Sequence, residues 1–407
     1  MQLDQGHGSR QRVWVGFDIG KGHHWASAVD ETGAQVWSLK IVNDEVAIAA
    51  AVDVALGLAD DVAWAVDVTS GPAGLLLALL DSREQKVRYV PGRTVNAMSA
   101  GYRGEAKTDA KDAFMIADIS RVRGDFAAIE VPSGLRVELS LLTAHRADLV
   151  ADRIRLISRL RELLTGVFPV LERAFDYSRH HGALVLLTGY QDPAALRRLG
   201  PARLRAWLTK RNVRRADQVA AAALAAAAEQ HATLPGQAVA GQIIADLAGQ
   251  LLALDDRLGR IDRQIAAVFA EHPQADIITS MPGIGITLAA EFVAVAGDLA
   301  SYPDAGRLAS AAGLVPVPRD SGRRTGNLHR PHRYSRRLRR VFYLAAQTSI
   351  VRDGPSRDFY LKKRSQGLRH VQAIIALARR RVDVLWALLR DNRPFSLEPP
   401  ARPAIAA

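Results

Sequence analysis

Short apolar stretches fill the first 121 residues and predict a mixed α/β domain. Three consecutive strands come first, at residues 13–19, 24–29 and 35–42. Helices and strands then alternate: a helix after the N-cap Asn43 that runs through Leu58, a strand at 62–68, a helix from 71 to about 82, a strand at 87–90, and a helix from 108 or 109 to about 121. A three-strand meander followed by strand–helix alternation is typical of the ribonuclease-H-like fold, in which the fourth strand lies beside the first and parallel to it.

The middle of the chain has heptad spacing. One set of leucines recurs every seven residues, at Leu142, Leu149, Leu156 and Leu163. A second set alternates spacings of three and four, at Ile244, Leu247, Leu251, Leu254, Leu258, Ile261, Ile265 and Val268. Both sets predict long helices that pair as an antiparallel coiled coil, for scaffolding or oligomer contacts. Between them lies an insertion with Pro193, Pro201 and the alanine run 220–228.

These patterns predict an α/β plus all-α protein with several regions. They are an N-terminal stretch at 1–11, the ribonuclease-H-like domain at 12–130, the helical coiled-coil region with its insertion at 131–274, a C-terminal helical domain at 275–390 with a helix-hairpin-helix-like segment, and a Pro-rich tail at 391–407. We expect both ends to be disordered.

Composition excludes several chemistries. The 407 residues include no cysteine, which rules out disulfides, thiolate metal sites and a cysteine nucleophile. Because no stretch approaches 18 uninterrupted apolar residues and the first twelve residues are polar and Gly-rich, we expect neither a membrane span nor a signal peptide. The sequence therefore predicts a cytoplasmic protein.

Positive charge is concentrated in one segment. Residues 319–381 contain eighteen Lys or Arg and three Asp or Glu, so their net charge is +15. Since the whole chain has a net charge of +12, the other residues together carry −3. Most of the cations are arginines, and several are interleaved with aromatic residues. Such a segment suits a nucleic-acid phosphate backbone, where neutralised phosphates release counterions.

Four aspartates are candidate metal ligands. Asp18 and Asp67 end the first and fourth strands, and Asp109 and Asp112 are three residues apart on one helix face. Clustered carboxylates repel one another, so a divalent cation is the simplest reason for them to converge. Hard oxygen ligands suit Mg²⁺ or Mn²⁺, and two such ions can clamp both oxygens of a phosphodiester exchange. We assign the nearby His23 and His24 to the second strand, not to the metal shell.

The C-terminal domain contains two glycine-rich motifs. Residues 277–290 predict helix, glycine hairpin and helix, in which Gly283 and Gly285 direct backbone N–H groups at a phosphate. Further on, Ser321 lies on a loop among arginines and could attack phosphorus, with Arg323 and Arg324 stabilising the developing charge. The candidate nucleic-acid contacts are Gly283, Gly285, Arg319, Arg323, Arg324, Arg333, Arg336, Arg337, Arg339, Arg340, Lys362, Lys363 and Arg364.

Four blocks in this order resemble the bacterial insertion-sequence transposases that combine a RuvC-like acidic tetrad with a C-terminal serine domain. They are residues 15–21, 107–113, 281–285, and 312–316 leading to Ser321. The resemblance implies a tetrad of Asp18, Asp67, Asp109 and Asp112, and Ser321 as a nucleophile that forms a phosphoserine link to DNA. It also implies a multimer, donor and target DNA as substrates, a structured guide (bridge) RNA, and association with the nucleoid.

The sequence departs from that family at one position and leaves alternatives open. Asp67 stands where the family commonly has Glu, which keeps the charge on a shorter side chain. Ser310 is a rival nucleophile that we expect to pack within a helix. The rival functions are a nucleic-acid-binding protein without catalysis, a RuvC-like nuclease that uses water, and a sugar-kinase or actin-like ATPase, for which the sequence offers no second phosphate loop.

Overall fold

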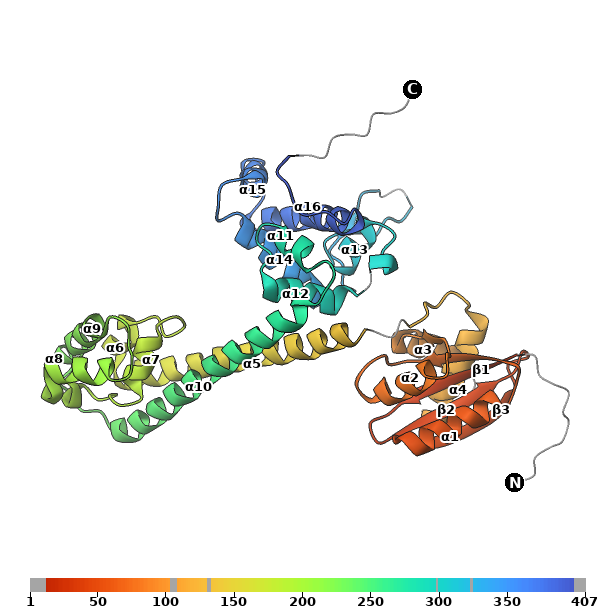
Figure 1. The fold of residues 1–407 in the computed structure, drawn as a ribbon, viewed down its shortest axis with the longest axis horizontal. Helices are drawn as coiled ribbons and strands as arrows, with labels where there is room; N and C mark the ends of the chain where they lie inside the picture. Colours follow the sequence, from red (N-terminus) through yellow and green to blue (C-terminus); the bar gives the residue numbers. More distant parts are fainter. Residues whose placement is uncertain (1–11, 103–107, 130–132, 298, 323–324, 399–407) are drawn as a thin grey trace. The chain divides into compact units, whose positions relative to one another are not determined.

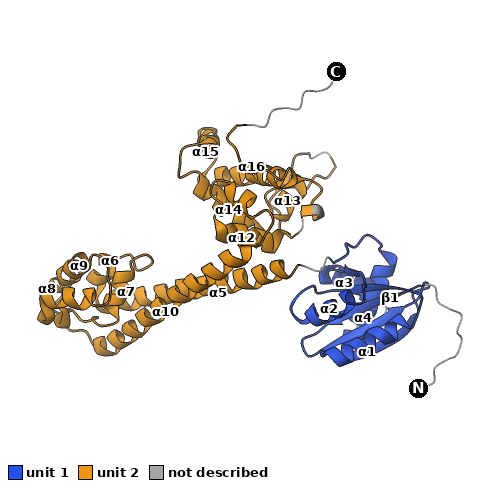
Figure 2. Cartoon of the chain, viewed as in Figure 1, with its two compact units in different colours: residues 1–132 blue, residues 133–407 orange. Residues whose placement is uncertain are grey.

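The computed structural model describes residues 12–102, 108–129, 133–297, 299–322 and 325–398. The chain divides into two compact units, unit 1 at residues 1–132 and unit 2 at residues 133–407 (Figure 2). The predicted disorder at 1–11 concerns residues outside the described part of the chain.

Unit 1 is a five-stranded sheet with helices on both faces (Figure 1). Its elements are β1 (Arg12–Ile19), β2 (His23–Val29), β3 (Gln35–Val42), α1 (Glu45–Leu56), β4 (Asp61–Val66), the 3-10 helix η1 (Gly71–Ala73), α2 (Gly74–Asp81), β5 (Val87–Tyr89), α3 (Gly92–Met98), the 3-10 helix η2 (Ser99–Gly101) and α4 (Asp109–Val122). The strand order is β3-β2-β1-β4-β5. β1, β2 and β3 pair antiparallel, whereas β4 lies parallel to β1 and to β5, which confirms the predicted neighbour of the first strand.

Alternate residues of the central strands face two separate cores. Trp64 and Val66 of β4 pack with Phe17 of β1 against the apolar sides of α1 and α2. Ala65, between them, faces the other way and packs with Met115 and other apolar residues of α4. This is the period of two expected for strands that are covered on both faces.

Two details of unit 1 differ from the sequence analysis. The N-cap of α1 is Asp44, whose carboxylate accepts a hydrogen bond from the Ala47 N–H at 2.8 Å, and not Asn43, whose side chain instead donates to the Lys21 carbonyl. Helix α3 was not predicted at all. It has only seven residues and begins directly after Pro91, so it offers too short an apolar period to detect.

Unit 2 is helical apart from one two-stranded hairpin among its described residues. Its elements are α5 (Gly134–Val167), α6 (Pro169–Ala174), α7 (His181–Leu187), α8 (Pro193–Thr209), α9 (Ala216–Ala228), α10 (Gln237–Ala270), α11 (Ala275–Ser280), α12 (Ile286–Ala296), the 3-10 helix η3 (Leu299–Ser301), α13 (Ala305–Ala311), β6 (Val317–Pro318), β7 (Leu328–His329), α14 (Arg336–Ser349), α15 (Pro355–Ser365) and α16 (His370–Arg390).

The two long helices, α5 and α10, run antiparallel. Arg146 pairs with Asp262 and Arg153 pairs with Asp255, each with the Arg Nε 2.5 Å from a carboxylate oxygen. Seven residues forward on α5 thus correspond to seven residues backward on α10, which fixes their direction and register. The antiparallel pairing agrees with the sequence analysis, and the supercoil of a coiled coil stays a prediction.

Helix α10 is also apolar enough to cross a membrane by length and composition, with a mean hydropathy of 1.3 over an 18-residue window. Its apolar side chains, however, cover those of α5, and its acids pair with arginines of α5. Both features are those of a helix packed within a protein.

Each end of this helix pair belongs to a separate core. At one end, Leu160 and Leu164 of α5 pack with α6 to α9, and we call residues 168–236 the insertion lobe. Elsewhere Leu139 of α5 joins α11 to α14 and α16 in the core of the C-terminal domain. Residues 391–398 correct the predicted tail, because Phe395 packs on that core and its N–H donates to Ser280 Oγ at 2.8 Å, while residues 399–407 lie outside the described part.

Candidate functional site

Two of the candidate aspartates meet at one end of the sheet of unit 1. Phe17 of β1 is level with Val66 of β4, so Asp18 and Asp67 come next on two parallel neighbouring strands. The Ile19 N–H donates to Asp67 Oδ1 at 3.3 Å, which ties the residue after β4 to the end of β1. The structure thus brings Asp18 and Asp67 to adjacent positions at the carboxyl ends of these strands.

Helix α4 brings the other two aspartates to the same region. Thr108 caps the helix by accepting from the Lys111 N–H, so that Asp109 and Asp112 lie in the first turn. The helix packs directly on β1 at Gly16, where an added Cβ would lie 2.3 Å from the Ala117 nitrogen and 2.5 Å from the Ala113 oxygen. Only glycine permits this backbone contact. Gly16, next to Phe17 and Asp18 on β1, therefore positions helix α4 and with it Asp109 and Asp112.

The pKa of Asp67 depends mainly on its burial, with a contribution from Asp112. Burial raises the pKa of Asp67, and the charge of Asp112 raises it further, whereas the hydrogen bond from the Ile19 N–H acts in the opposite direction. The carboxylate oxygens suit a hard divalent cation, which would relieve this repulsion. Among the described residues, however, no group of three or more His, Asp or Glu side chains stands close enough to hold a metal ion. The donor set fits a cation, but its side chains are not assembled around one position.

A histidine of β2 contacts the acidic region. The Nε2 of His23 lies 3.3 Å from Asp109 Oδ2, and both side chains are partly exposed. Its neighbour His24 is buried, and burial lowers the pKa of His24. Both histidines belong to β2, as predicted. The contact with Asp109 was missed because 86 residues separate the partners, and only the β1–β2 hairpin register could have indicated it.

Ser321 lies on the hairpin between β6 and β7. The Arg319 N–H donates to the Asn327 carbonyl, and the Asn327 N–H donates to Asp320 Oδ1, both at 2.9 Å. Gly322 has a φ of 57°, a left-handed conformation that suits glycine. The Ser321 side chain is exposed. Arg323 and Arg324, the predicted charge stabilisers, lie outside the described residues.

The rival serine is placed partly as expected. Ser310 lies in helix α13, as expected, but its side chain is exposed and takes no part in the packing of that helix against the core. Burial therefore does not distinguish Ser310 from Ser321. What distinguishes them is backbone context, since Ser310 lies within a helix and Ser321 within a glycine-containing loop.

The two glycines of the turn between α11 and α12 have different surroundings, since Gly283 packs against α14 and Gly285 faces open space. Gly283 has a φ of 84°, and an added Cβ would lie 2.5 Å from the Ala345 oxygen of α14. Gly285, in contrast, is exposed at the N-cap of α12 with open space around it. Of the two predicted phosphate contacts, only Gly285 has room for an approaching phosphate.

Some of the predicted phosphate-binding arginines have partners inside the protein. Glu291 is buried, and its carboxylate pairs with Arg337 at 3.4 Å and with Arg340 at 2.5 Å. Arg339 donates to the Gly313 carbonyl and covers the Tyr334 ring. The remaining described candidates, apart from the half-buried Lys363, are exposed: Arg319, Arg333, Arg336, Lys362 and Arg364. Sequence reasoning missed Glu291 because it lies 46 residues before its nearer partner.

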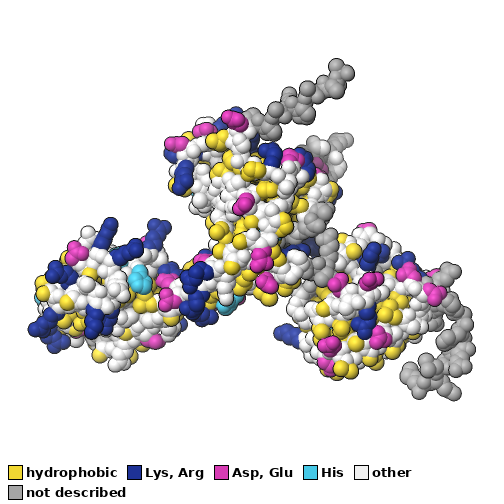
Figure 3. Space-filling model, in the orientation of Figure 1, with side chains coloured by type: hydrophobic (Ala, Val, Ile, Leu, Met, Phe, Trp, Pro, Cys, Tyr) yellow, Lys and Arg dark blue, Asp and Glu magenta, His cyan; other side chains and the backbone are white. Residues whose placement is uncertain are grey.

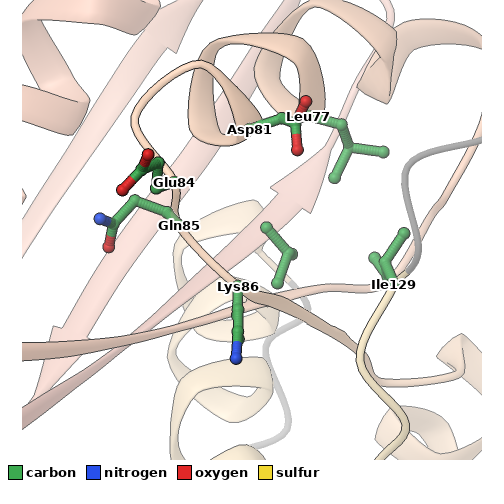
Figure 4. Close-up of a pocket in the computed structure, with 7 residues that line it drawn as sticks. Leu77, Asp81, Glu84, Gln85, Lys86 and Ile129 are labelled. Atoms are coloured by element: carbon green, nitrogen blue, oxygen red, sulfur yellow. The ribbon is translucent and has the colours of Figure 1, made fainter.

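A small hollow in unit 1 is unrelated to the aspartates. It has a volume of about 230 Å³ and lies where α2 ends and β5 begins, with Leu77, Asp81, Lys86 and Ile129 among its lining residues (Figure 4). Since Asp67 follows the far end of β4, this hollow lies at the opposite end of the parallel strands.

Comparison with known proteins decides the family. A transposase model with the DEDD domain of the IS110 group matches residues 15–169, and a model of the IS116/IS110/IS902 transposase family matches residues 275–361. The chain is 59% identical to the 44.8 kDa protein of insertion element IS116 from Streptomyces clavuligerus, over 96% of this chain and 97% of that protein. The chain belongs to the IS110/IS116 family of transposases. It is thus a DNA-recombining enzyme.

Other relatives extend the comparison. The chain is 49% identical to the 42 kDa protein of insertion element IS900 from Mycobacterium paratuberculosis, over 95% of this chain and 97% of that protein. It is 29% identical to the pilin gene-inverting protein of Moraxella lacunata, over 34% of this chain and 45% of that protein. The first family model spans all four candidate aspartates of this transposase, and the second spans the glycine turn and Ser321. Residues 170–274, between them, fall in neither model.

Proposed function

We propose that this transposase cuts and rejoins donor and target DNA with a cation-binding set of four aspartates and Ser321 as the nucleophile. One observation carries the proposal. Asp67, next to Asp18 at the strand ends, is destabilised in its charged form by burial and by Asp112 from α4. A protein gains nothing in stability from such an arrangement, and perturbed carboxylates of this kind cluster at functional sites.

The residues that would hold the cation are Asp18, Asp67, Asp109 and Asp112. A bound Mg²⁺ or Mn²⁺ would neutralise charge on the phosphodiester and its leaving oxygen. Asp67 is already oriented by the Ile19 N–H, so its second oxygen is the one left for a ligand. Asp109 must give up its contact with His23 to contribute, or else bind on the side away from it.

The serine step conserves the number of phosphoester bonds. Ser321 Oγ bonds to phosphorus, the bond from phosphorus to a deoxyribose oxygen breaks, and the serine proton passes to that oxygen. The hydroxyl of the other DNA then attacks the phosphoserine and releases Ser321. Because each step replaces one phosphoester bond with another of similar energy, strand exchange needs no nucleotide cofactor. The exposed hairpin loop supports this role because DNA can reach it.

The partners follow from the family resemblance and from charge. The basic segment 319–381 supports binding of donor and target DNA. A structured guide RNA that pairs with both DNAs, a homodimer or homotetramer formed through the long helices, and a cytoplasmic location at the nucleoid complete the proposal.

A reconstituted exchange reaction tests it. The full chain, guide RNA, Mg²⁺ and both DNAs are incubated, and recombinant junctions are quantified. We expect Asp67→Asn and Asp109→Asn each to lower exchange by at least ~1000-fold, as expected when transition-state charge stabilisation is removed. Asp81→Asn, an exposed acid at the other end of the sheet, is the matched control and should exchange normally. Normal exchange by either site variant would refute the metal site.

A further inference from the structure

The insertion lobe carries a second basic surface. Residues 193–216 contain eight Lys or Arg and no Asp or Glu. The residues outside 319–381 have a net charge of −3, which conceals this basic stretch because acidic residues elsewhere balance its charge. Figure 3 shows several Lys and Arg side chains on the visible face of the lobe. Arg197 joins two parts of the lobe, donating to the Ala227 carbonyl in α9 and to the Gln230 carbonyl after it.

The other seven cations are exposed and have no carboxylate within ion-pair distance among the described residues: Arg198, Arg203, Arg205, Lys210, Arg211, Arg214 and Arg215. On α5, in contrast, several arginines are paired, such as Arg146 with Asp262 and Arg161 with Glu172. Unpaired cations repel one another, so leaving them together costs stability unless an anionic partner binds.

The carboxyl end of α8 gathers part of this charge. Arg203 and Trp207 are four residues apart on one face of the helix, Lys210 is its C-cap, and Arg211 follows in the next turn. Arg214 and Arg215 come directly before α9. We call Arg203, Lys210, Arg211, Arg214 and Arg215 the lobe patch.

The centre of the lobe patch is held in place. The Trp207 ring packs edge-on against Tyr190 at 5.0 Å, and an added Cβ on Gly189 would lie 2.4 Å from that ring. The Arg211 guanidinium lies 3.7 Å from the centre of the same ring and donates to the Trp207 carbonyl at 3.3 Å. Stacking and the hydrogen bond thus hold the Arg211 guanidinium in place, although the end of a long side chain is usually mobile. Less conformational entropy is therefore lost when it binds a phosphate.

We propose that the lobe patch binds the phosphate backbone of duplex DNA, as a contact separate from that of the C-terminal domain. The occupant follows from charge complementarity and from the transposase family, whose substrate is DNA. Helix α5 separates the lobe from the C-terminal core, and the 21 residues from Leu139, in that core, to Leu160, in the lobe core, span about 32 Å. At 3.4 Å per base pair this is roughly 9 base pairs, so the lobe would grip DNA that flanks the reacting strands.

Site-specific crosslinking tests the contact directly, because the chain has no cysteine of its own. Ala206 is exposed near the patch residues on α8, and Ala253→Cys on α10, three residues before the exposed Asp256, is the matched control. Each full-length Cys variant is labelled with a benzophenone and irradiated with a 60-base-pair duplex. We expect the Ala206→Cys variant to crosslink strongly at low salt and weakly at high salt, and the control to crosslink at least ~10-fold less.

A charge variant provides the second measurement. The patch variant carries the four substitutions Arg203→Gln, Lys210→Gln, Arg214→Gln and Arg215→Gln. The control variant carries Arg159→Gln, Arg173→Gln, Arg257→Gln and Arg260→Gln, which remove the same charge from exposed arginines that each lie within four residues of an acid in the sequence. The patch variant should flatten the slope of log K against log salt by about 3 to 4, at ~0.9 per phosphate contact, and the control by less than about 1.

Three results would overturn the proposal. One is an equal change of slope in both charge variants. Another is failure of the Ala206 probe to crosslink DNA. The third is crosslinking at Ala206 to a structured RNA hairpin but not to the duplex, which would make RNA the occupant. Each leaves the proposed chemistry at Asp67 and Ser321 untouched, since exchange on short duplexes is measured separately.

Discussion

The two regions proposed to react with DNA are built in different ways. In unit 1 the aspartates stand on strand ends and on the first turn of a helix, and the contact of Gly16 with the α4 backbone fixes their relation. In unit 2 Ser321 lies on a short hairpin held mainly by hydrogen bonds of Arg319, Asp320 and Asn327. The acidic region therefore depends on main-chain packing, whereas the serine region depends on a few polar contacts. Substitutions should disturb the two regions to very different extents.

The largest structural effect is expected from Gly16→Val. Its side chain would collide with the backbone of α4, which must move away and take Asp109 and Asp112 with it. We expect a loss of about 1–3 kcal/mol in the free energy of unfolding, as for overpacked cores, and loss of exchange. Chemical denaturation and the exchange assay measure the two. Gly74→Ala, where nothing lies within 4 Å of the added Cβ, is the control and should behave like wild type.

A smaller effect is expected in the hairpin. Asp320→Ala removes the acceptor of the Asn327 N–H at an exposed position. We expect the free energy of unfolding to fall by less than about 1 kcal/mol, because the lost hydrogen bond is replaced by water. Exchange should nevertheless fall about 10-fold, since a loop that positions a reactive group loses much from a small misplacement. Asp353→Ala, in another exposed loop, should change neither. A large loss of stability in Asp320→Ala would show that the hairpin is part of the core.

The smallest effect concerns pH. The folded state binds the Asp67 proton more tightly than the unfolded state does, since its pKa is raised. The contribution of Asp67 to stability therefore decreases as pH rises from near 4, the ordinary pKa of Asp, through the raised value. Asp67→Asn does not titrate, so its unfolding midpoint should equal or exceed that of wild type at neutral pH. Thermal unfolding from pH 4 to 8 checks this, and a lower midpoint for the variant at pH 7 contradicts it.

Patterns close together in the sequence predicted most of unit 1. Alternating strands and the spacing of Asp109 and Asp112 suffice to place the acidic residues near one edge of a sheet. The sequence could not show that Gly16 sets the distance between α4 and β1, because that contact joins residues about 100 positions apart. The same limit hid the contact of His23 with Asp109.

Charge was harder to interpret than hydrophobic period. The basic segment was read as uniformly available to nucleic acid, but Glu291 engages Arg337 and Arg340. Conversely, the positive charge of residues 193–216 is concealed in the net charge of the chain, because acids elsewhere balance it. Whether a surface arginine is paired depends on tertiary neighbours, so composition alone gives only the regional excess.

The most direct test of the central claim is covalent attachment of DNA to Ser321. Wild type, Ser321→Ala and Ser310→Ala are incubated with guide RNA, Mg²⁺ and labelled donor and target DNA, quenched in denaturant and resolved by gel electrophoresis. We predict a protein–DNA adduct for wild type and Ser310→Ala, none for Ser321→Ala, and the adduct of wild type mapped by mass spectrometry to Ser321. An adduct of equal yield from Ser321→Ala, or recombinant DNA formed with no adduct in any sample, would contradict the account.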